Sequence, residues 1–363
     1  MTSTPDTARA WVDVDLGALT ANARTLAAIA GARLLPMVKA NGYGLGAVAV
    51  ARALEPLDPW GYGVASVDEG AVLRAGGIGR PILVVSPLLV GDIEGHLAHD
   101  LRPTIGDPQA LAAWLARSRR PFHVEIDSGM ARAGLRWDDA EALAAVAEQL
   151  QETPGWEGVF THFHSADTDP ASAARQWERF QGVLAALPHR PPLVHAANSA
   201  AALRGRRYAG DLIRPGIFLY GGGAGGPAPA AVATLRARVL AVRRVGAGEP
   251  VSYGATWNAP RATTVATLAL GYADGFPRSA RESAALPPRL IELNGALAPV
   301  IGRVTMDMTM VDAGEAQPAP GDVATVYGGR VSLDQQATAA GTISYEMLTA
   351  LGQRVPRRYR SES

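Results

Sequence analysis

Short apolar runs, rich in β-branched residues, recur through the first two-thirds of the chain. Between most of them lie Ala- and Leu-rich segments whose apolar residues have helical spacing, such as Asp138 to Leu150 and Ser172 to Leu187. Pro or Gly stands at most boundaries. The pattern predicts eight strands, at Leu34–Val38, Tyr62–Ala65, Ile82–Ser86, Arg102–Ile105, Phe122–Ile126, Gly158–Thr161, Leu193–Ala197 and Leu212–Arg214.

Eight strands that alternate with helices over roughly 200 residues are typical of an α/β fold of the (β/α)8 TIM-barrel type. A doubly wound open sheet is the alternative, and it normally carries a G-x-G-x-x-G motif after its first strand. The segment 42–47, GYGLGA, lacks the final glycine of that motif. We therefore expect the barrel.

The pattern changes after the glycine-rich segment 221–231, where helical spacing disappears until about Ser344–Leu351. Gly, Pro and Asn separate five further predicted strands, at Arg236–Val245, Thr263–Leu270, Leu290–Leu293, Ala298–Ile301 and Val323–Val326. We expect a barrel over residues 1–235 and a C-terminal, mostly-β domain over 236–363. The first ten or so residues would form a tail, and Trp11–Asp15 a strand that packs with the β domain.

Composition excludes several classes of protein. Apolar residues make up 48% of the 363 residues and charged residues 19%, as in a folded protein of about two domains. The 34 basic and 34 acidic residues balance, which argues against a nucleic-acid partner. The absence of cysteine excludes thiolate metal sites and thiol nucleophiles. No apolar stretch suits a signal sequence or a membrane span, so we expect a cytoplasmic protein.

Lysine usage points to a reactive amine. Of the 34 basic residues only Lys39 is a lysine, and all the others are arginines. Arginine can supply any generic surface cation, but it cannot replace a primary amine that must lose its proton and attack a carbonyl group. Lys39 ends the first predicted strand, where barrel enzymes place their reactive groups.

Other polar groups follow later strands in the same way. They are Glu125, Asp127 and Arg132 at or after the fifth strand, His162 at the end of the sixth, Asn198 and Ser199 after the seventh, and Arg214 at the end of the eighth. A barrel would bring these groups together at one mouth, where the loops after strands seven and eight commonly bind phosphate. A lysine at this mouth suits a Schiff base with a sugar aldehyde or with pyridoxal phosphate, and the phosphate loops favour pyridoxal phosphate.

A set of motifs covers essentially the whole chain from about residue 11. It comprises PMVKANGYGLGA (36–47), DSGMARAGL (127–135), THFHSAD (161–167), NSAA (198–201), RPGIFLYG (214–221), SYGATW (252–257), LGYADGFPR (270–278), GRVTMDMTMVD (302–312) and RVPRRY (354–359). In this order the motifs resemble those of alanine racemases, a barrel-type family that depends on pyridoxal phosphate.

The resemblance implies a homodimer with composite active sites that interconverts L- and D-alanine by two bases. Lys39 would hold the cofactor and act as one base, and Tyr253 would reach in from the other subunit as the second. Racemisation needs a proton removed from one face of Cα and returned to the other, which two opposed bases do directly. His162 and Arg132 would assist the tyrosine, and Arg214 would donate a hydrogen bond to the pyridine nitrogen and so keep it unprotonated.

The resemblance also implies three sets of binding residues. Cofactor contacts would come from Lys39, Tyr43, His162, Ser199, Arg214, Gly216, Ile217 and Tyr345. Substrate contacts would come from Arg132, Tyr253 and the backbone N–H of Met306. Asp167, Tyr272, Arg278 and Arg303 would line the entrance, with Asp307 beside Met306.

Two positions depart from the family, Glu125 and Thr305, and the second stands where a cysteine is common. Many members carry a lysine, modified to a carbamate that orients the arginine, where this chain has Glu125. Glutamate supplies a carboxylate without modification and would orient Arg132 directly. We expect no metal, because His162 and His164 form an H-x-H pair without a third ligand nearby.

Three alternatives to an alanine racemase stay open at this point. They are a same-fold racemase for serine or a broader set of amino acids, a non-catalytic carrier of pyridoxal phosphate, and an amino-acid decarboxylase. Decarboxylases usually place a carboxylate at the pyridine nitrogen, where this chain offers Arg214. The resemblance implies a supply of D-alanine for a bacterial cell wall.

Overall fold

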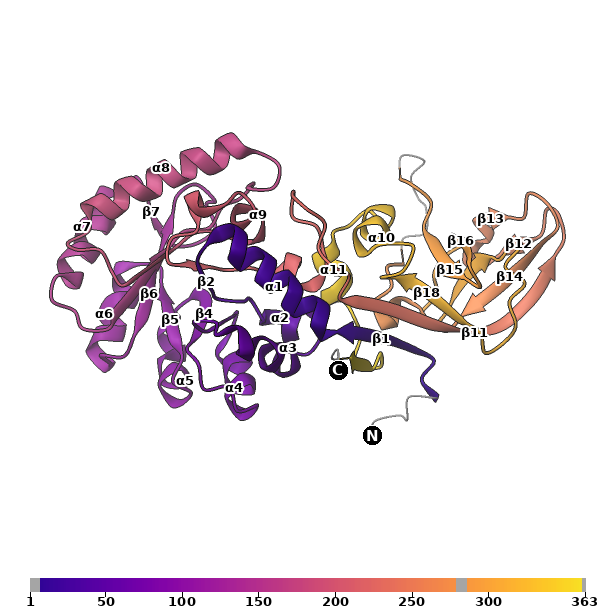
Figure 1. The fold of residues 1–363 in the computed structure, drawn as a ribbon, viewed down its shortest axis with the longest axis horizontal. Helices are drawn as coiled ribbons and strands as arrows, with labels where there is room; N and C mark the ends of the chain where they lie inside the picture. Colours follow the sequence, from indigo (N-terminus) through magenta and orange to yellow (C-terminus); the bar gives the residue numbers. More distant parts are fainter. Residues whose placement is uncertain (1–6, 279–285, 361–363) are drawn as a thin grey trace.

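The computed structural model describes residues 7–278 and 286–360. Two lobes lie side by side along the long axis of the molecule, with a β/α lobe at one end and a β lobe at the other (Figure 1). None of the described helices is both long and apolar enough to cross a membrane.

The β/α lobe is a barrel of parallel strands, and all eight predicted strands are present. They are β2 (Arg33–Leu34), β3 (Tyr62–Val64), β4 (Ile82–Pro87), β5 (Arg102–Ile105), β6 (Phe122–Asp127), β8 (Trp156–Phe160), β9 (Leu193–His195) and β10 (Leu212–Ile213). Strand β10 pairs with β2, and a bridge between Met37 and Gly63 joins β2 to β3. The N–H of Asp211 donates to the carbonyl of Val194 at 2.7 Å, which brings β9 beside β10. The predicted (β/α)8 barrel is confirmed.

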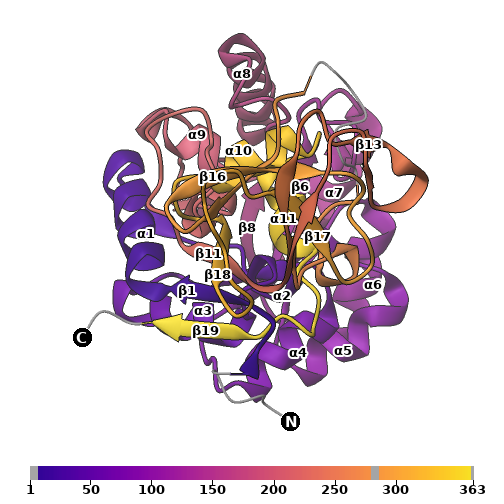
Figure 2. The same ribbon diagram turned by 90° about the vertical axis from the view of Figure 1, so that its right-hand side faces the viewer.

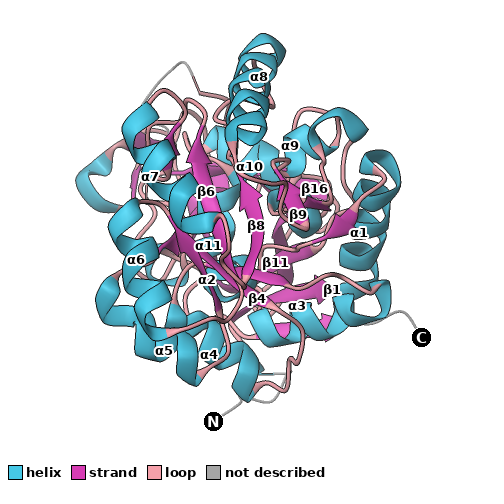
Figure 3. Ribbon diagram, turned by 90° about the vertical axis from the view of Figure 1, so that its left-hand side faces the viewer, coloured by secondary structure: helices cyan, strands magenta, loops and turns pink. Residues whose placement is uncertain are grey.

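Helices surround these strands, as the view from the barrel end shows (Figure 3). They are α1 (Leu16–Ala30), α3 (Ala47–Leu54), α4 (Val67–Ala75), α5 (Ile93–Ala98), α6 (Pro108–Arg117), α7 (Ala140–Leu150), α8 (Pro170–Ala186) and the short α9 (Ser199–Ala202). Side chains of Asp, Ser or Asn cap many of their N-termini; Asp107, for example, accepts the N–H of Ala110. A short strand, β7 (Leu135–Arg136), pairs with β6 beyond the barrel.

The β lobe is built on one eight-stranded sheet. Its order is β14 (Thr263–Leu268), β17 (Thr309–Asp312), β16 (Ala296–Ile301), β15 (Leu290–Leu293), β18 (Val323–Tyr327), β11 (Ala233–Val245), β1 (Ala10–Asp15) and β19 (Arg357–Arg360). Because β11 also pairs with β14, six of these strands close on themselves. Two short strands, β12 (Pro250–Val251) and β13 (Trp257–Asn258), form a separate hairpin, and α10 (Leu333–Ala339) and α11 (Ser344–Thr349) complete the lobe.

The five strands predicted for the C-terminal part are all present, whereas β12, β13, β17, β19 and α10 were not predicted. Strand β11 runs across the predicted domain division at 235/236. The N-terminal strand β1 lies between β11 and β19, antiparallel to the first and parallel to the second. It leads directly into α1 of the barrel, so the first and last segments of the chain meet in the β lobe (Figure 2).

Candidate active site

A cavity of about 300 Å³ opens at the mouth of the barrel, where the strands end. Ten of the predicted site residues line it: Lys39, Tyr43, Glu125, Arg132, His162, Ser199, Arg214, Gly216, Ile217 and Tyr345. Eight of them follow barrel strands, Glu125 lies in β6 itself, and Tyr345 comes from α11 of the β lobe. A barrel brings residues from distant strands together because the C-terminal ends of its parallel strands all lie at one face.

Lys39 begins a short turn, α2 (Lys39–Tyr43), whose backbone is left-handed. Ala40, Asn41 and Gly42 have φ angles of 51°, 54° and 63°, in the left-handed region. That region is unfavourable for residues with a Cβ, so other contacts must hold the turn. Glu69 of α4 supplies one of them, because its carboxylate accepts the N–H of Ala40 at 2.5 Å. The same carboxylate accepts the N–H of Ala65, just after β3, at 2.7 Å.

The environment of the Lys39 amine favours its neutral form. Its pKa is lowered from the ordinary value by burial, and further by the positive charges of Arg132 and Arg214. The carboxylate of Glu69 opposes this effect. A larger share of the amine is therefore unprotonated than for a lysine in water, as carbonyl attack requires.

One end of the cavity brings Ser199, Gly216 and Tyr43 together. The hydroxyl of Ser199 accepts the N–H of Gly216 at 2.9 Å, which ties together the loops that follow β9 and β10. A Cβ on Gly216 would lie 2.3 Å from the hydroxyl of Tyr43, so glycine is needed for this hydroxyl to lie close to the backbone. The Tyr43 ring stacks on Tyr220, with centroids 4.4 Å apart, and it lies 6.0 Å from the ring of Tyr345.

Arg214 is held rigidly beneath the cavity. Its side chain is buried, and its two terminal nitrogens donate to the carbonyls of Thr161 (2.6 Å), His195 (3.0 Å) and Ala196 (3.1 Å). A further hydrogen bond of 2.7 Å joins Nη1 to Nδ1 of His195. Burial lowers the pKa of Arg214 to about 10, which still leaves the guanidinium charged at neutral pH. Arg214 thus presents a fixed donor to whatever occupies the cavity.

His162 and Glu125 complete the lining with opposite electrostatic behaviour. Burial, then the charges of Arg214, Arg132 and Lys39, lowers the pKa of His162 to about 3, so the imidazole is neutral. Burial raises the pKa of Glu125 to about 7 against the pull of both arginines. Its Oε2 atom is buried and has no hydrogen-bond partner among the described residues. Cationic groups therefore dominate the cavity.

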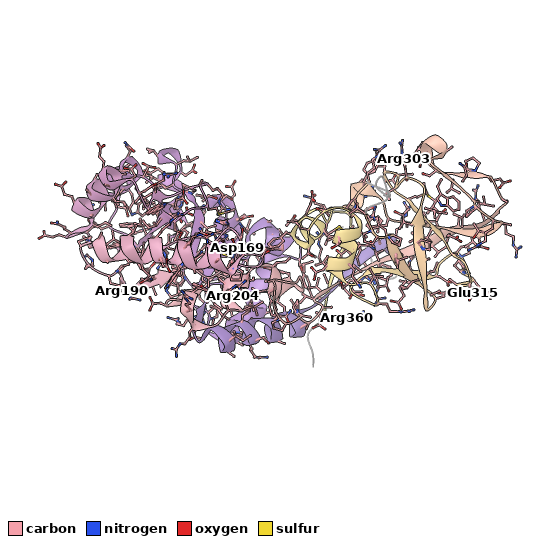
Figure 4. All side chains as sticks on the ribbon, turned by 90° about the horizontal axis from the view of Figure 1, so that it is seen from above. Asp169, Arg190, Arg204, Arg303, Glu315 and Arg360 are labelled. Carbon is pink, nitrogen blue, oxygen red and sulfur yellow. The ribbon has the colours of Figure 1, made fainter. Side chains whose placement is uncertain are left out.

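The structure leaves the other predicted site residues apart from this cavity. Tyr253, Tyr272, Arg278, Arg303, Met306 and Asp307 belong to the β lobe, and Asp167 lies in the loop between β8 and α8. In Figure 4, Arg303 lies on the β lobe, far from Arg204 of the barrel. Tyr253 is 72% exposed and Met306 53% exposed. Within one chain, the predicted residues that line the cavity and the predicted residues of the β lobe therefore lie on separate surfaces.

Residues of the β-lobe set lie near one another. The hydroxyl of Ser252, next to Tyr253, donates to the carbonyl of Arg303 at 2.6 Å. The N–H of Tyr272 donates to the carbonyl of Thr305 at 3.0 Å. Met306 follows Thr305, so Tyr253, Tyr272, Arg303 and Met306, here called the β-lobe patch, form one partly apolar surface.

Two lining residues with a recognisable signal, Phe160 and Thr349, escaped prediction from sequence, as did Glu69, which lies outside the cavity lining. Phe160 lies two residues before His162 and carries the Arg214 guanidinium over its ring, 4.9 Å from the centroid. Thr349 lies one helical turn after Tyr345, a spacing that places both on one face of α11. The spacing of two residues along a strand and of four along a helix could have predicted Phe160 and Thr349 from the sequence. Glu69 gave none, because only the folded chain brings its carboxylate to the turn after Lys39.

Comparison with known proteins bears on the whole chain. The family model for the alanine racemase N-terminal domain matches residues 14–224, and that for the alanine racemase C-terminal domain matches residues 232–359. This chain belongs to the alanine racemase family. Alanine racemase from Carboxydothermus hydrogenoformans is 37% identical over 96% of this chain and 99% of its own length. That from Symbiobacterium thermophilum is 38% identical over 97% of both.

Solved alanine racemases have the same fold. The structure from Bartonella henselae, described with covalently bound pyridoxal phosphate, superposes with a TM-score of 0.89 at 31% identity and covers 97% of this chain and 100% of its own. The enzyme from D-cycloserine-producing Streptomyces lavendulae gives 0.88 at 34% identity, covering 99% of both chains. The predicted resemblance and fold are thus confirmed, and the cavity at Lys39 is the candidate active site of an alanine racemase.

Proposed function

We propose that this member of the alanine racemase family interconverts L- and D-alanine with pyridoxal phosphate held on Lys39. The observation that carries the proposal is the environment of the only lysine. Its amine, with a lowered pKa, shares one cavity with Arg132, His162 and Arg214. As a racemase of this family the chain is an isomerase.

The cavity residues fit the cofactor. Its volume of about 300 Å³ suits a small ligand, and its cationic lining suits a phosphate. Tyr43, Ser199, Gly216, Ile217 and Tyr345 would hold the phosphate group, and the absence of a side chain at Gly216 lets the Tyr43 hydroxyl lie close to the backbone there. Arg214 would donate to the pyridine nitrogen. When bound, pyridoxal phosphate supplies an electron-withdrawing ring that makes the Cα proton of an attached amino acid acidic.

Two groups of the protein would move that proton. Lys39 would act on one face of Cα, and Tyr253 of the partner subunit on the other. Tyrosine is a weak acid, with a reference pKa of about 10, so it needs cationic neighbours to serve as a base. Arg132 offers such a charge, whereas His162, being neutral, offers a hydrogen bond. Arg132 and the backbone N–H of Met306 of the partner subunit would receive the substrate carboxylate.

The exposure of the second base supports a homodimer. Tyr253 is 72% exposed and lies outside the cavity of its own chain. A head-to-tail pair would cover the β-lobe patch and complete both cavities at once, as the two-fold symmetry of a dimer allows. Asp167, Tyr272, Arg278 and Arg303, with Asp307 beside Met306, would then line the entrance. We place the enzyme in the cytoplasm, supplying D-alanine for a cell wall.

The lone lysine makes a direct test possible. The protein, incubated with pyridoxal phosphate, is reduced with borohydride, digested and examined by mass spectrometry. In parallel, circular dichroism follows L-alanine with the unreduced enzyme. We expect the label on Lys39 and an optical signal that decays to zero. A label without loss of signal would favour a carrier or a racemase for another amino acid, such as serine. No label on Lys39 would overturn the proposal.

A further inference from the structure

A line of polar side chains crosses the interior of the barrel beneath Arg214. Nδ1 of His195 lies 2.7 Å from Nη1 of Arg214. Nε2 of His195 lies 2.8 Å from Nδ1 of His123, and Nε2 of His123 lies 3.3 Å from Oε2 of Glu157. Barrel interiors are ordinarily filled with branched apolar side chains. Two fully buried imidazoles in such a place require a physical reason.

The two ends of this line determine where its hydrogens lie. A guanidinium has donors only, so Nδ1 of His195 must accept from Arg214 and its hydrogen must lie on Nε2. That N–H donates to Nδ1 of His123, whose own hydrogen then lies on Nε2. An ionised carboxylate only accepts, so Glu157 receives this last hydrogen. Each hydrogen bond thus points from Arg214 towards Glu157, and both imidazoles are neutral.

We propose that Glu157 is a positioning residue for Arg214, acting through His123 and His195. As the terminal acceptor, it keeps the hydrogen of each imidazole on Nε2, which leaves Nδ1 of His195 free to hold the guanidinium. The inference rests on the proposed function, because Arg214 is there assigned to the pyridine nitrogen. It adds a residue at the opposite end of the barrel interior, remote from the cavity.

The surroundings of the line support this role. Burial lowers the pKa of both histidines, which disfavours a second proton on either ring. Burial acts against ionisation of Glu157, but the hydrogen bond from His123 and the charge of Arg102 lower its pKa overall. Nε of Arg102 lies 3.4 Å from Oε2 of Glu157. The carboxylate is therefore held as an acceptor.

Packing also fixes the two rings. The ring of Phe160 stacks on His195, with centroids 4.9 Å apart and planes at 16°. A Cβ on Gly158 would lie 2.5 Å from Nδ1 of His123, so this residue of β8 leaves room for the imidazole. The rings cannot swing to find other partners.

Loss of the terminal acceptor has a defined consequence. Without Glu157, Nε2–H of His123 is a buried donor without a partner, which is unfavourable. Moving that hydrogen to Nδ1 would set it against Nε2–H of His195. If His195 changed in turn, its Nδ1–H would oppose Arg214. Each of these rearrangements disturbs the chain of hydrogen bonds that holds the Arg214 guanidinium.

The test uses the full-length holoenzyme labelled with 15N-histidine. Nitrogen NMR distinguishes an imidazole nitrogen that carries hydrogen from one that does not. Wild type is compared with Glu157→Ala, with Glu157→Gln, whose amide oxygen can still accept, and with Glu178→Ala, which changes an exposed glutamate of α8. Variants of His123 and His195 assign the signals. The kcat and KM for alanine are measured on the same samples.

We expect wild type, Glu157→Gln and Glu178→Ala to show both buried histidines with hydrogen on Nε2 only. Glu157→Ala should shift the nitrogen signals of His123 and His195 and lower kcat by roughly tenfold or more, with little change in KM, as substitutions of orienting groups do elsewhere. Hydrogen on Nδ1 of either histidine in wild type would overturn the proposal, even if Glu157→Ala fails to fold. So would unchanged nitrogen signals and kcat in a folded Glu157→Ala protein.

The two proposals fail in different ways. An enzyme that lacks racemase activity but shows the expected imidazole signals would refute the proposed function alone. An active racemase with reversed imidazole hydrogens would refute the role of Glu157 alone.

Discussion

Glu69 accepts the N–H of Ala40, the residue after Lys39, at 2.5 Å. The second oxygen of the same carboxylate accepts the N–H of Ala65 at 2.7 Å. Glu69 therefore joins the end of β3 to a left-handed turn in which Ala40, Asn41 and Tyr43 all have positive φ. Left-handed backbone costs about 1–2 kcal/mol for each residue with a Cβ, so the turn depends on contacts of this kind.

Replacement of Glu69 should weaken that turn. We expect Glu69→Ala to lower the free energy of unfolding by about 2 kcal/mol, because two backbone N–H groups lose a charged acceptor. The pKa of Lys39 should also fall further, because Glu69 raises it. Urea denaturation measures the first effect. Asp68→Ala, an exposed change in the same helical turn, is the control, and equal losses in both variants would contradict the assignment.

Glu125 should make stability depend on pH. Its pKa rises from 4.5 to about 7 on folding, chiefly through burial. Between these values the unfolded chain loses the proton that the folded chain keeps, so stability falls as pH rises, by roughly 3 kcal/mol in all. Glu125→Gln should remove this fall between pH 5 and pH 8. The control is Glu148→Gln on the exposed face of α7, and a Glu125→Gln protein with the wild-type pH slope would disprove the shift.

Tyr253→Phe should affect the two enantiomers of alanine unequally. Under single-turnover conditions in D₂O, exchange of the Cα proton should be lost for the enantiomer whose proton faces the tyrosine and retained for the one that faces Lys39. Each enantiomer serves as the control for the other. Equal loss for both would count against the two-base assignment.

A composite site predicts complementation between inactive variants. Lys39→Ala and Tyr253→Ala proteins should each lack activity. Mixed and allowed to exchange subunits, they should regain about a quarter of the wild-type activity, since half of the dimers are hybrids and each hybrid has one intact site. If both residues of a site came from the same chain, no activity would return.

Arg214→Glu should change the outcome of the reaction. A carboxylate at the pyridine nitrogen favours its protonation, which strengthens the ring as an electron sink and should raise transamination relative to racemisation. Pyruvate formed per racemisation event measures this ratio. An unchanged ratio in a variant that still binds the cofactor would mean that Arg214 does not contact the ring.

Local patterns sufficed for much of the fold. The eight barrel strands and their order could be predicted because short stretches of sequence are enough to show apolar strands alternating with amphipathic helices. The strand β17 (Thr309–Asp312) was missed because Met310 and Val311 are its only apolar residues. The helix α10 (Leu333–Ala339) was missed because Leu333 is its only large apolar residue. The strands that were found place Lys39 and Arg214 at the same mouth without any knowledge of tertiary contacts.

By itself, the sequence determined the family, the barrel, the lone lysine at its mouth and ten of the residues that line the cavity. Only the tertiary structure decided that Tyr253 and Met306 lie outside the cavity of their own chain, that Glu69 supports the turn at Lys39, and that Glu157 connects to Arg214. The physical reason is the separation of these residues along the sequence. Periodicity and motifs report on neighbours along the chain, whereas these relationships join residues that are close only after strands and lobes have packed.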